Sequence, residues 1–211
     1  MNYTETLKNY LQSHQGELFD VGYEHETRFG MMDKKTMTRI IGRLSEEDML
    51  MQIVKGVFYI NGLDEFTEDK IVCYYCSGMM GMKVGSSLFS YLEIKSKDTE
   101  ETEIITNKVE SNKKIGNYRI YRVDIPLYDD GFVDVITLLE IFEKLREPYN
   151  NVRLMKVVQK CISNYSDKVF EAIIKCTDYK LSTVLKLQNV FKAAGKENKM
   201  FEIFEKCGSD E

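Results

Sequence analysis

Apolar residues recur at intervals of three and four near the start of the chain, and again over its last third. Such spacing is typical of amphipathic helices. It predicts a first helix over residues 4–14, with Thr4 as its N-cap, and a third helix over residues 33–45. Between them, the glycine-punctuated residues 16–32 have room only for a short second helix.

Two short runs of β-forming residues, LMQIV and VFYI, follow the third helix and are separated by Lys55-Gly56. Glycine supplies the positive φ that a tight turn requires, so residues 50–60 predict a β-hairpin. The order of helix, short helix, helix and hairpin is that of a winged helix-turn-helix. Asn61-Gly62 ends this module.

Residues 63–131 have a mixed pattern. Residues 67–82 begin as a helix that Gly78 and Gly81 interrupt, and the polar residues 95–101 predict a surface loop. A further short helix is expected over 84–94, and β-rich runs over 102–109 and 116–127.

From Val133 onward the apolar spacing is helical almost without interruption, and the sequence has no repeat of fixed period. We therefore predict an α+β chain. Residues 1–62 form a winged helix-turn-helix DNA-binding domain, and residues 63–211 form a second domain that is mixed α/β to about residue 131 and a helical bundle over 132–211. The helices expected in this bundle cover residues 133–146, 152–165, 166–177, 180–195 and 197–208.

The predicted third helix has an apolar side and a basic side. Its basic residues at i, i+4 and i+8 lie about 150° from the centre of the apolar side. Arginine and lysine bind phosphates and guanine edges, and threonine binds phosphates or thymine methyl groups. The helix therefore suits a DNA major groove, although a solvated cationic face is the alternative. The apolar side consists of Met37, Ile40, Ile41 and Leu44. The predicted DNA-binding residues are Lys34, Lys35, Thr36, Thr38, Arg39, Arg43 and, at the hairpin tip, Lys55.

Acidic residues Glu46, Glu47 and Asp48 follow the basic helix directly and would repel phosphate unless the fold turns them away. We therefore expect modest DNA affinity with a strong salt dependence. The formal net charge of −5 excludes a surface coated in basic groups, but it does not exclude one local basic face. A second hypothesis is a protein-interaction module that uses the winged helix as a platform without binding DNA.

Catalytic and metal chemistry find little support. The sequence has two histidines, no glycine-rich phosphate loop and no nucleophile elbow, so we expect no enzyme, no cofactor and no metal. Cys73 and Cys76 form a lone CxxC within an apolar helical run, which indicates core positions. The odd number of five cysteines predicts free thiols and a cytoplasmic protein, and no apolar run is long enough to span a membrane.

Three stretches resemble the AbiEi family, the antitoxins of type IV toxin-antitoxin systems. TMTRIIGRLSEEDMLMQIVKGVFYI is similar to the N-terminal winged helix of that family, whose pattern is helix, Arg-Leu, short turn, apolar strand, Gly and aromatic strand. GMKVGSSLFSYLEI resembles its Gly-Ser/Ala-leading helix. IITNKVESNKKIGNYRIYRVD resembles its Thr-Asn strand, basic turn and second strand. The resemblance extends loosely from residue 1 to about residue 145, and Asp48 stands where the family usually has Gly.

The resemblance implies a cytoplasmic antitoxin that is also a transcriptional autorepressor. In the family, the winged helix binds inverted repeats of operator DNA upstream of its own operon, which makes a homodimer on DNA an expected assembly. The C-terminal domain, here residues 63–211, counteracts a nucleotidyltransferase-like toxin, and direct contact with the toxin is not required.

Overall fold

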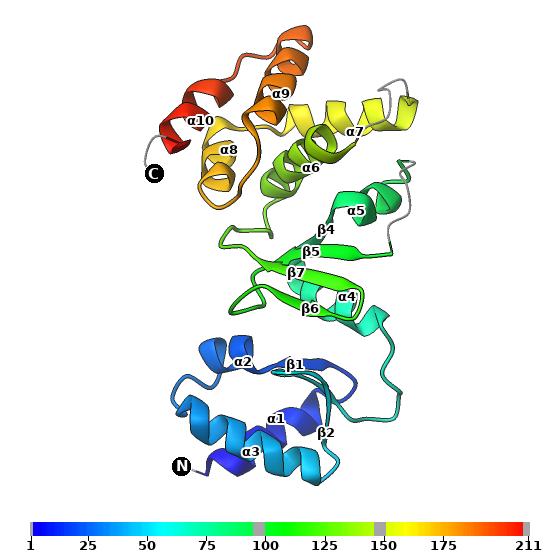
Figure 1. Cartoon of the computed structure of the whole chain (residues 1–211), viewed down its shortest axis with the longest axis vertical. Helices are drawn as coiled ribbons and strands as arrows, with labels where there is room; N and C mark the ends of the chain where they lie inside the picture. The colour runs from blue at the N-terminus through cyan, green and yellow to red at the C-terminus, as the bar shows by residue number, and fades with distance from the viewer. Residues whose placement is uncertain (1, 95–99, 146–150, 209–211) are drawn as a thin grey trace.

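A computed structural model describes residues 2–94, 100–145 and 151–208 of the chain. These residues form a mixed α+β structure with ten α-helices and two small sheets, which confirms the predicted class. The N-terminal elements lie at one end, a four-stranded sheet lies in the middle, and the last five helices lie at the other end (Figure 1). Within the described residues, no helix is long and apolar enough to cross a lipid bilayer.

The N-terminal module packs three helices on one face of a three-stranded antiparallel sheet, whose strand order is β1-β3-β2. Asn2 caps the first helix by accepting a hydrogen bond from the Glu5 N–H, so the predicted cap at Thr4 is wrong and Thr4 lies inside the first turn. The third helix and the hairpin occur as predicted. The elements are α1 (Tyr3–Ser13), β1 (Leu18–Asp20), α2 (Val21–Thr27), α3 (Lys34–Glu46), β2 (Leu50–Val54) and β3 (Val57–Ile60).

The middle region has a sheet of order β4-β5-β7-β6, in which β5 and β7 are parallel and the other neighbours are antiparallel. Strands β4 and β6 were not predicted. Gly81 begins β4 because the strand passes against α4, where a Cβ would lie 2.2 Å from the carbonyl oxygen of Tyr75. The elements are α4 (Asp69–Cys76), the 3₁₀ turn η1 (Ser77–Met79), β4 (Gly81–Val84), α5 (Gly85–Tyr91), β5 (Thr102–Thr106), β6 (Lys113–Ile115) and β7 (Tyr118–Arg122). Most of the predicted loop 95–101 lies outside the described residues.

The C-terminal helices pack around α6, which is buried on nearly all sides between Phe132 and Phe142. This burial explains the almost continuous apolar sequence of α6. All five predicted helices are present, although the end of the first, at residue 146, lies outside the described residues. They are α6 (Asp130–Lys144), α7 (Val152–Ser163), α8 (Asp167–Ile174), α9 (Leu181–Ala193) and α10 (Met200–Gly208).

One hydrophobic core joins the N-terminal module to the middle region. The N-terminal sheet buries Leu18, Val57 and Tyr59 on the face away from its own helices, against Tyr75 of α4 and Ile120 of β7. The residues on both sides of position 62 therefore share apolar packing, which joins the N-terminal module to the middle region.

Candidate nucleic-acid interface

Helix α3 presents its basic side to solvent because its apolar side is the centre of the N-terminal core. Met37 and Leu44 are fully buried. Asp33 caps the helix, accepting a hydrogen bond of 3.1 Å from the Thr36 N–H. Since α3 is anchored at its N-terminus and along one side, its outward residues have fixed positions.

Three of the predicted residues lie together on this outward side: Lys35, Arg39 and Arg43 are all exposed. Thr36 and Thr38 lie on opposite flanks of this stripe, since residues two positions apart on a helix differ by about 200°. The Thr38 hydroxyl donates to the Lys34 carbonyl at 2.9 Å, which leaves its oxygen available as an acceptor.

Lys34 is held by the middle region. Its ammonium donates to both carboxylate oxygens of Glu110, each at 2.7 Å. This hydrogen bond is the largest cause of the lowered pKa of Glu110. Lys34 therefore forms a contact across the shared boundary, which the spacing along α3 does not indicate.

A groove of about 630 Å³ separates α3 from the hairpin and from the segment 110–113. Gly42 and Ser45 of α3 line one wall, and Gln52 and Lys55 of the hairpin line the other. Gly56 turns the hairpin at φ +80°, with Lys55 exposed beside it. The Ser45 hydroxyl is buried and has no hydrogen-bond partner among the described residues. Lys55 thus lies across the groove from α3 and apart from the basic stripe.

The acidic turn after α3 divides into two parts. Glu47 points to α1 and pairs with Lys8 at 2.6 Å. Asp48 adopts the left-handed conformation at φ +56°, and its carbonyl accepts a hydrogen bond from the Asn61 side chain. Glu46 stays exposed, and its position seven residues after Arg39 places it on the outward side. One carboxylate therefore lies within the basic stripe.

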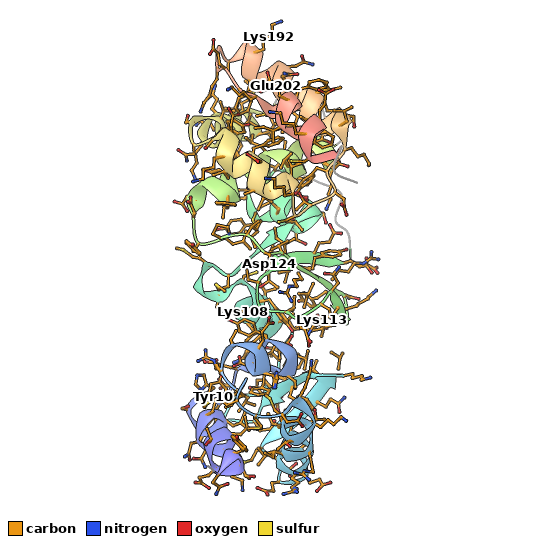
Figure 2. The ribbon with its side chains drawn as sticks, turned by 90° about the vertical axis from the view of Figure 1, so that its left-hand side faces the viewer. Tyr10, Lys108, Lys113, Asp124, Lys192 and Glu202 are labelled. Carbon is orange, nitrogen blue, oxygen red and sulfur yellow. The ribbon has the colours of Figure 1, made fainter. Side chains whose placement is uncertain are left out.

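Two buried carboxylates, Asp20 and Glu24, bind groups of the middle region. Tyr74 donates to Glu24 at 3.0 Å, and Tyr10 and Arg28 complete the contacts of that carboxylate. Burial, followed by the charge of Glu24, raises the pKa of Tyr74. Figure 2 shows Lys108 and Lys113 on the middle-region side of this boundary and Tyr10 within the N-terminal module. These contacts could not be predicted from the sequence, because the partners are far apart in the chain.

The two cysteines of the CxxC in α4 are less buried than predicted. Cys73 is exposed and Cys76 is half-buried, so the prediction that both are core residues is wrong. α4 is packed on only one side, and Cys73 lies on the side that faces solvent. Burial raises the pKa of the Cys76 thiol to about 11, which keeps it protonated at neutral pH. All five cysteines are free thiols. Across the described residues, no cluster of histidine, cysteine and carboxylate side chains has a metal-binding arrangement.

Comparison with known proteins gives no assignment: no protein-family model matches the chain, and no curated protein matches it.

Proposed function

We propose that residues 1–62 are a winged helix-turn-helix that binds operator DNA, within a cytoplasmic autorepressor and type IV antitoxin of the AbiEi kind. The observation that carries the DNA-binding part is the exposed stripe of Lys35, Arg39 and Arg43 on a helix whose opposite side is buried. A fixed helix with this charge pattern suits a major groove, because its side chains reach phosphates and base edges together.

In this proposal, α3 enters the major groove and the hairpin lies over the adjacent backbone. Arg39 and Arg43 contact guanine edges or phosphates, and Lys55 contacts a phosphate beyond the groove that separates it from α3. The wing has one cation, so each copy binds modestly, and two copies on an inverted repeat supply the affinity of the repressor.

The antitoxin role is assigned to residues 63–211, on the resemblance and on the structural roles of its motif residues. Gly85 begins α5 at φ +61° and its N–H donates to the buried Glu140 at 2.7 Å. Thr106 at the end of β5 donates to the Tyr75 carbonyl, and Asn107 donates to the Ile125 carbonyl. These positions have specific backbone and hydrogen-bonding roles, which gives the shared motif a physical basis. The proposed activity is to oppose a nucleotidyltransferase-like toxin without requiring contact with it.

The DNA-binding part is tested with the charge reversal Arg39→Glu in an electrophoretic mobility shift on the DNA upstream of the gene. We expect a loss of at least tenfold in affinity with an unchanged circular dichroism spectrum, because the side chain faces away from the core. Lys192→Glu is the matched control, since it makes the same charge change on the exposed side of α9, at the far end of the molecule (Figure 2). Equal affinity of the two variants would refute the assigned face.

The antitoxin part is tested separately in cells. A nucleotidyltransferase-like protein encoded beside this gene is expressed alone and together with this chain. We expect growth arrest with the first alone and restored growth with both, including with the Arg39→Glu variant. Failure of the chain to restore growth would remove the antitoxin role and leave the DNA-binding proposal untouched.

The second candidate function, a protein-interaction module, is favoured by one observation. Glu46 lies exposed among the cations of α3, which weakens the attraction of this surface for phosphate. Binding to DNA at about 50 mM salt discriminates the two candidates, since phosphate contacts are strongest at low salt. Absence of binding under that condition favours the interaction module.

A further inference from the structure

A second cavity lies between the middle region and the C-terminal helices, far from α3. Its volume is about 560 Å³, within the range of small-molecule sites in proteins. β4 and α5 line one side and α6 and α7 line the other, and the walls include Met82, Leu88, Leu127 and Val157. The cavity is therefore suited to an apolar ligand body.

The mouth of the cavity carries two exposed apolar side chains. Met79 is 63% exposed and Tyr91 is 75% exposed, and both line the cavity. Met79 also has a left-handed backbone, at φ +56°. A ligand that fills the cavity would cover both side chains, and this burial would add to its affinity.

One carboxylate in the wall has unused hydrogen-bonding capacity. The Asp134 side chain is only 6% exposed. Its Oδ2 accepts a hydrogen bond of 2.6 Å from the Asn164 amide. Within the described residues, Oδ1 has only weak contacts, with the Cys161 thiol at 3.4 Å and the Lys160 ammonium at 3.6 Å. A buried carboxylate oxygen without a strong donor favours a ligand that supplies one.

The position of Lys160 indicates which kind of hydrogen-bond donor suits Oδ1 of Asp134. Its ammonium already lies near Oδ1, yet its side chain is 71% exposed and its stem is free to move into solvent. An ion pair with so exposed a lysine is weak and easily exchanged. Asp134, in contrast, is fixed on a buried helix. The wall also includes Lys83 of β4 and the exposed Asp130, so its charged groups are two lysines and two carboxylates. Asp134 is the buried carboxylate among them, and the lysine nearest to it, Lys160, can be released.

The two thiols in the cavity wall, Cys76 and Cys161, are not reactive as thiolates at neutral pH. Burial, followed by the charge of Asp134, raises the pKa of Cys161 to about 12. Cys76 has a pKa of about 11 for the same first reason. Both thiols therefore stay protonated at neutral pH, and neither supplies a thiolate nucleophile to the cavity.

We propose that this cavity binds a small amphipathic amine, with its ammonium group on Oδ1 of Asp134 and its apolar body between Leu88 and Val157. The ligand ammonium replaces that of Lys160. The proposal concerns a site separate from the DNA-binding surface and does not depend on it.

Three probes that share a phenylethyl body test the proposal on the full chain by NMR titration: 2-phenylethylamine, 2-phenylethanol and 3-phenylpropionate. We expect the amine to bind with a Kd of about 1 mM or below, and at least tenfold more tightly than the alcohol or the carboxylate. Equal binding of amine and alcohol, tighter binding of the carboxylate, or no binding of the amine at about 10 mM would each overturn the proposal.

Two variants locate the ammonium. Asp134→Asn is expected to remove the preference for the amine while leaving the weak binding of the alcohol. Because that change is buried, Lys160→Gln provides a test at an exposed position: it removes the competing ammonium and is expected to raise amine affinity about threefold, with no change for the alcohol. An unchanged amine affinity in Lys160→Gln would contradict the assigned head-group position.

Discussion

The phenol of Tyr75 donates a hydrogen bond of 2.9 Å to Oδ2 of Asp20, across the boundary between the N-terminal module and α4. Asp20 is fully buried, and the same oxygen is paired with the ammonium of Lys113. Burial, followed by the charge of Asp20, raises the pKa of Tyr75, which keeps the phenol protonated as a donor. This polar contact fixes an orientation that the shared apolar core alone would leave less specific.

Loss of the Asp20 carboxylate is expected to destabilise the whole chain. Asp20→Ala leaves the Tyr75 hydroxyl without its acceptor and Lys113 without its partner in a largely buried site, so the free energy of unfolding should fall by about 2–4 kcal/mol. Urea denaturation measures this change. The control is Asp64→Ala, whose exposed pair with Lys70 at 3.8 Å should contribute less than about 0.5 kcal/mol. Similar losses in both variants would contradict a structural role for Asp20.

The isolated residues 1–62 are expected to be much less stable than the same residues in the full chain. Truncation exposes Leu18, Val57 and Tyr59, all nearly or fully buried in the core shared with α4. Each large apolar side chain contributes about 1.5–3 kcal/mol when buried, so the loss is comparable to the total stability of a small domain. Thermal unfolding followed by circular dichroism checks this expectation. A cooperative transition near that of the full chain would show that the module folds independently.

The sequence predicted those parts of the fold that are encoded locally. α3 lies within one residue of its predicted bounds because apolar spacing and the cap at Asp33 both belong to the helix itself. Strand β1 was missed because it has three residues and exists only through pairing with β3, as between Leu18 and Tyr59. Very short strands carry too little period-two pattern to be recognised before their partner is known.

The candidate site divides in the same way. The outward stripe of α3 follows from helical geometry, so it could be predicted. The ion-pair partners of charged residues near this stripe could not be predicted. Lys8 pairs with Glu47, and Glu110 pairs with Lys34. Both pairs join separate elements and depend on tertiary packing, which one sequence without its fold does not reveal.

Removal of the Glu110 charge is expected to strengthen DNA binding. Glu110→Gln releases Lys34 at the N-terminus of α3 and removes a negative charge from the edge of the groove. We expect a two- to fivefold gain in affinity at about 50 mM salt and a smaller gain at about 200 mM, measured by fluorescence anisotropy. An equal gain at both salt concentrations would exclude an electrostatic cause.

The same pair gives a pH dependence of defined sign. The pKa of Glu110 is lower in the folded chain than in the unfolded chain, because Lys34 donates to the carboxylate. The stabilisation is therefore complete above the unfolded pKa, and it is lost as the pH falls through the lower folded pKa. Glu110→Gln should be less stable than the natural chain by under about 1 kcal/mol at neutral pH, and the two should converge in acid.

Glu46 is expected to limit the affinity of α3 for DNA. Glu46→Gln keeps the size of the side chain and removes the negative charge from the basic stripe, so affinity should rise about three- to tenfold at low salt. Glu65→Gln is the matched control, because Glu65 is exposed and lies outside α3 and the hairpin. If the control gains as much as Glu46→Gln, the effect comes from net charge and not from the outward side of α3.

A side chain at Gly85, at the junction of β4 and α5, is expected to destabilise the fold for two separate reasons. Gly85 has φ +61°, and a Cβ there would lie 2.4 Å from Oε2 of Glu103. That oxygen accepts a hydrogen bond of 2.9 Å from Lys144, so moving it away breaks a contact between the middle sheet and α6. Gly195 has a similar φ of +67° but open space around the Cβ position.

Comparison of Gly85→Ala with Gly195→Ala separates the energetic cost of the left-handed backbone from the cost of displacing Glu103. Both substitutions incur the left-handed backbone penalty of about 1 kcal/mol. Gly85→Ala should cost about 1–2 kcal/mol more, because it also displaces Glu103 from Lys144. Urea denaturation of the two variants measures the difference. Equal losses would mean that Glu103 moves aside freely and that the Gly85 position requires glycine for its backbone conformation alone.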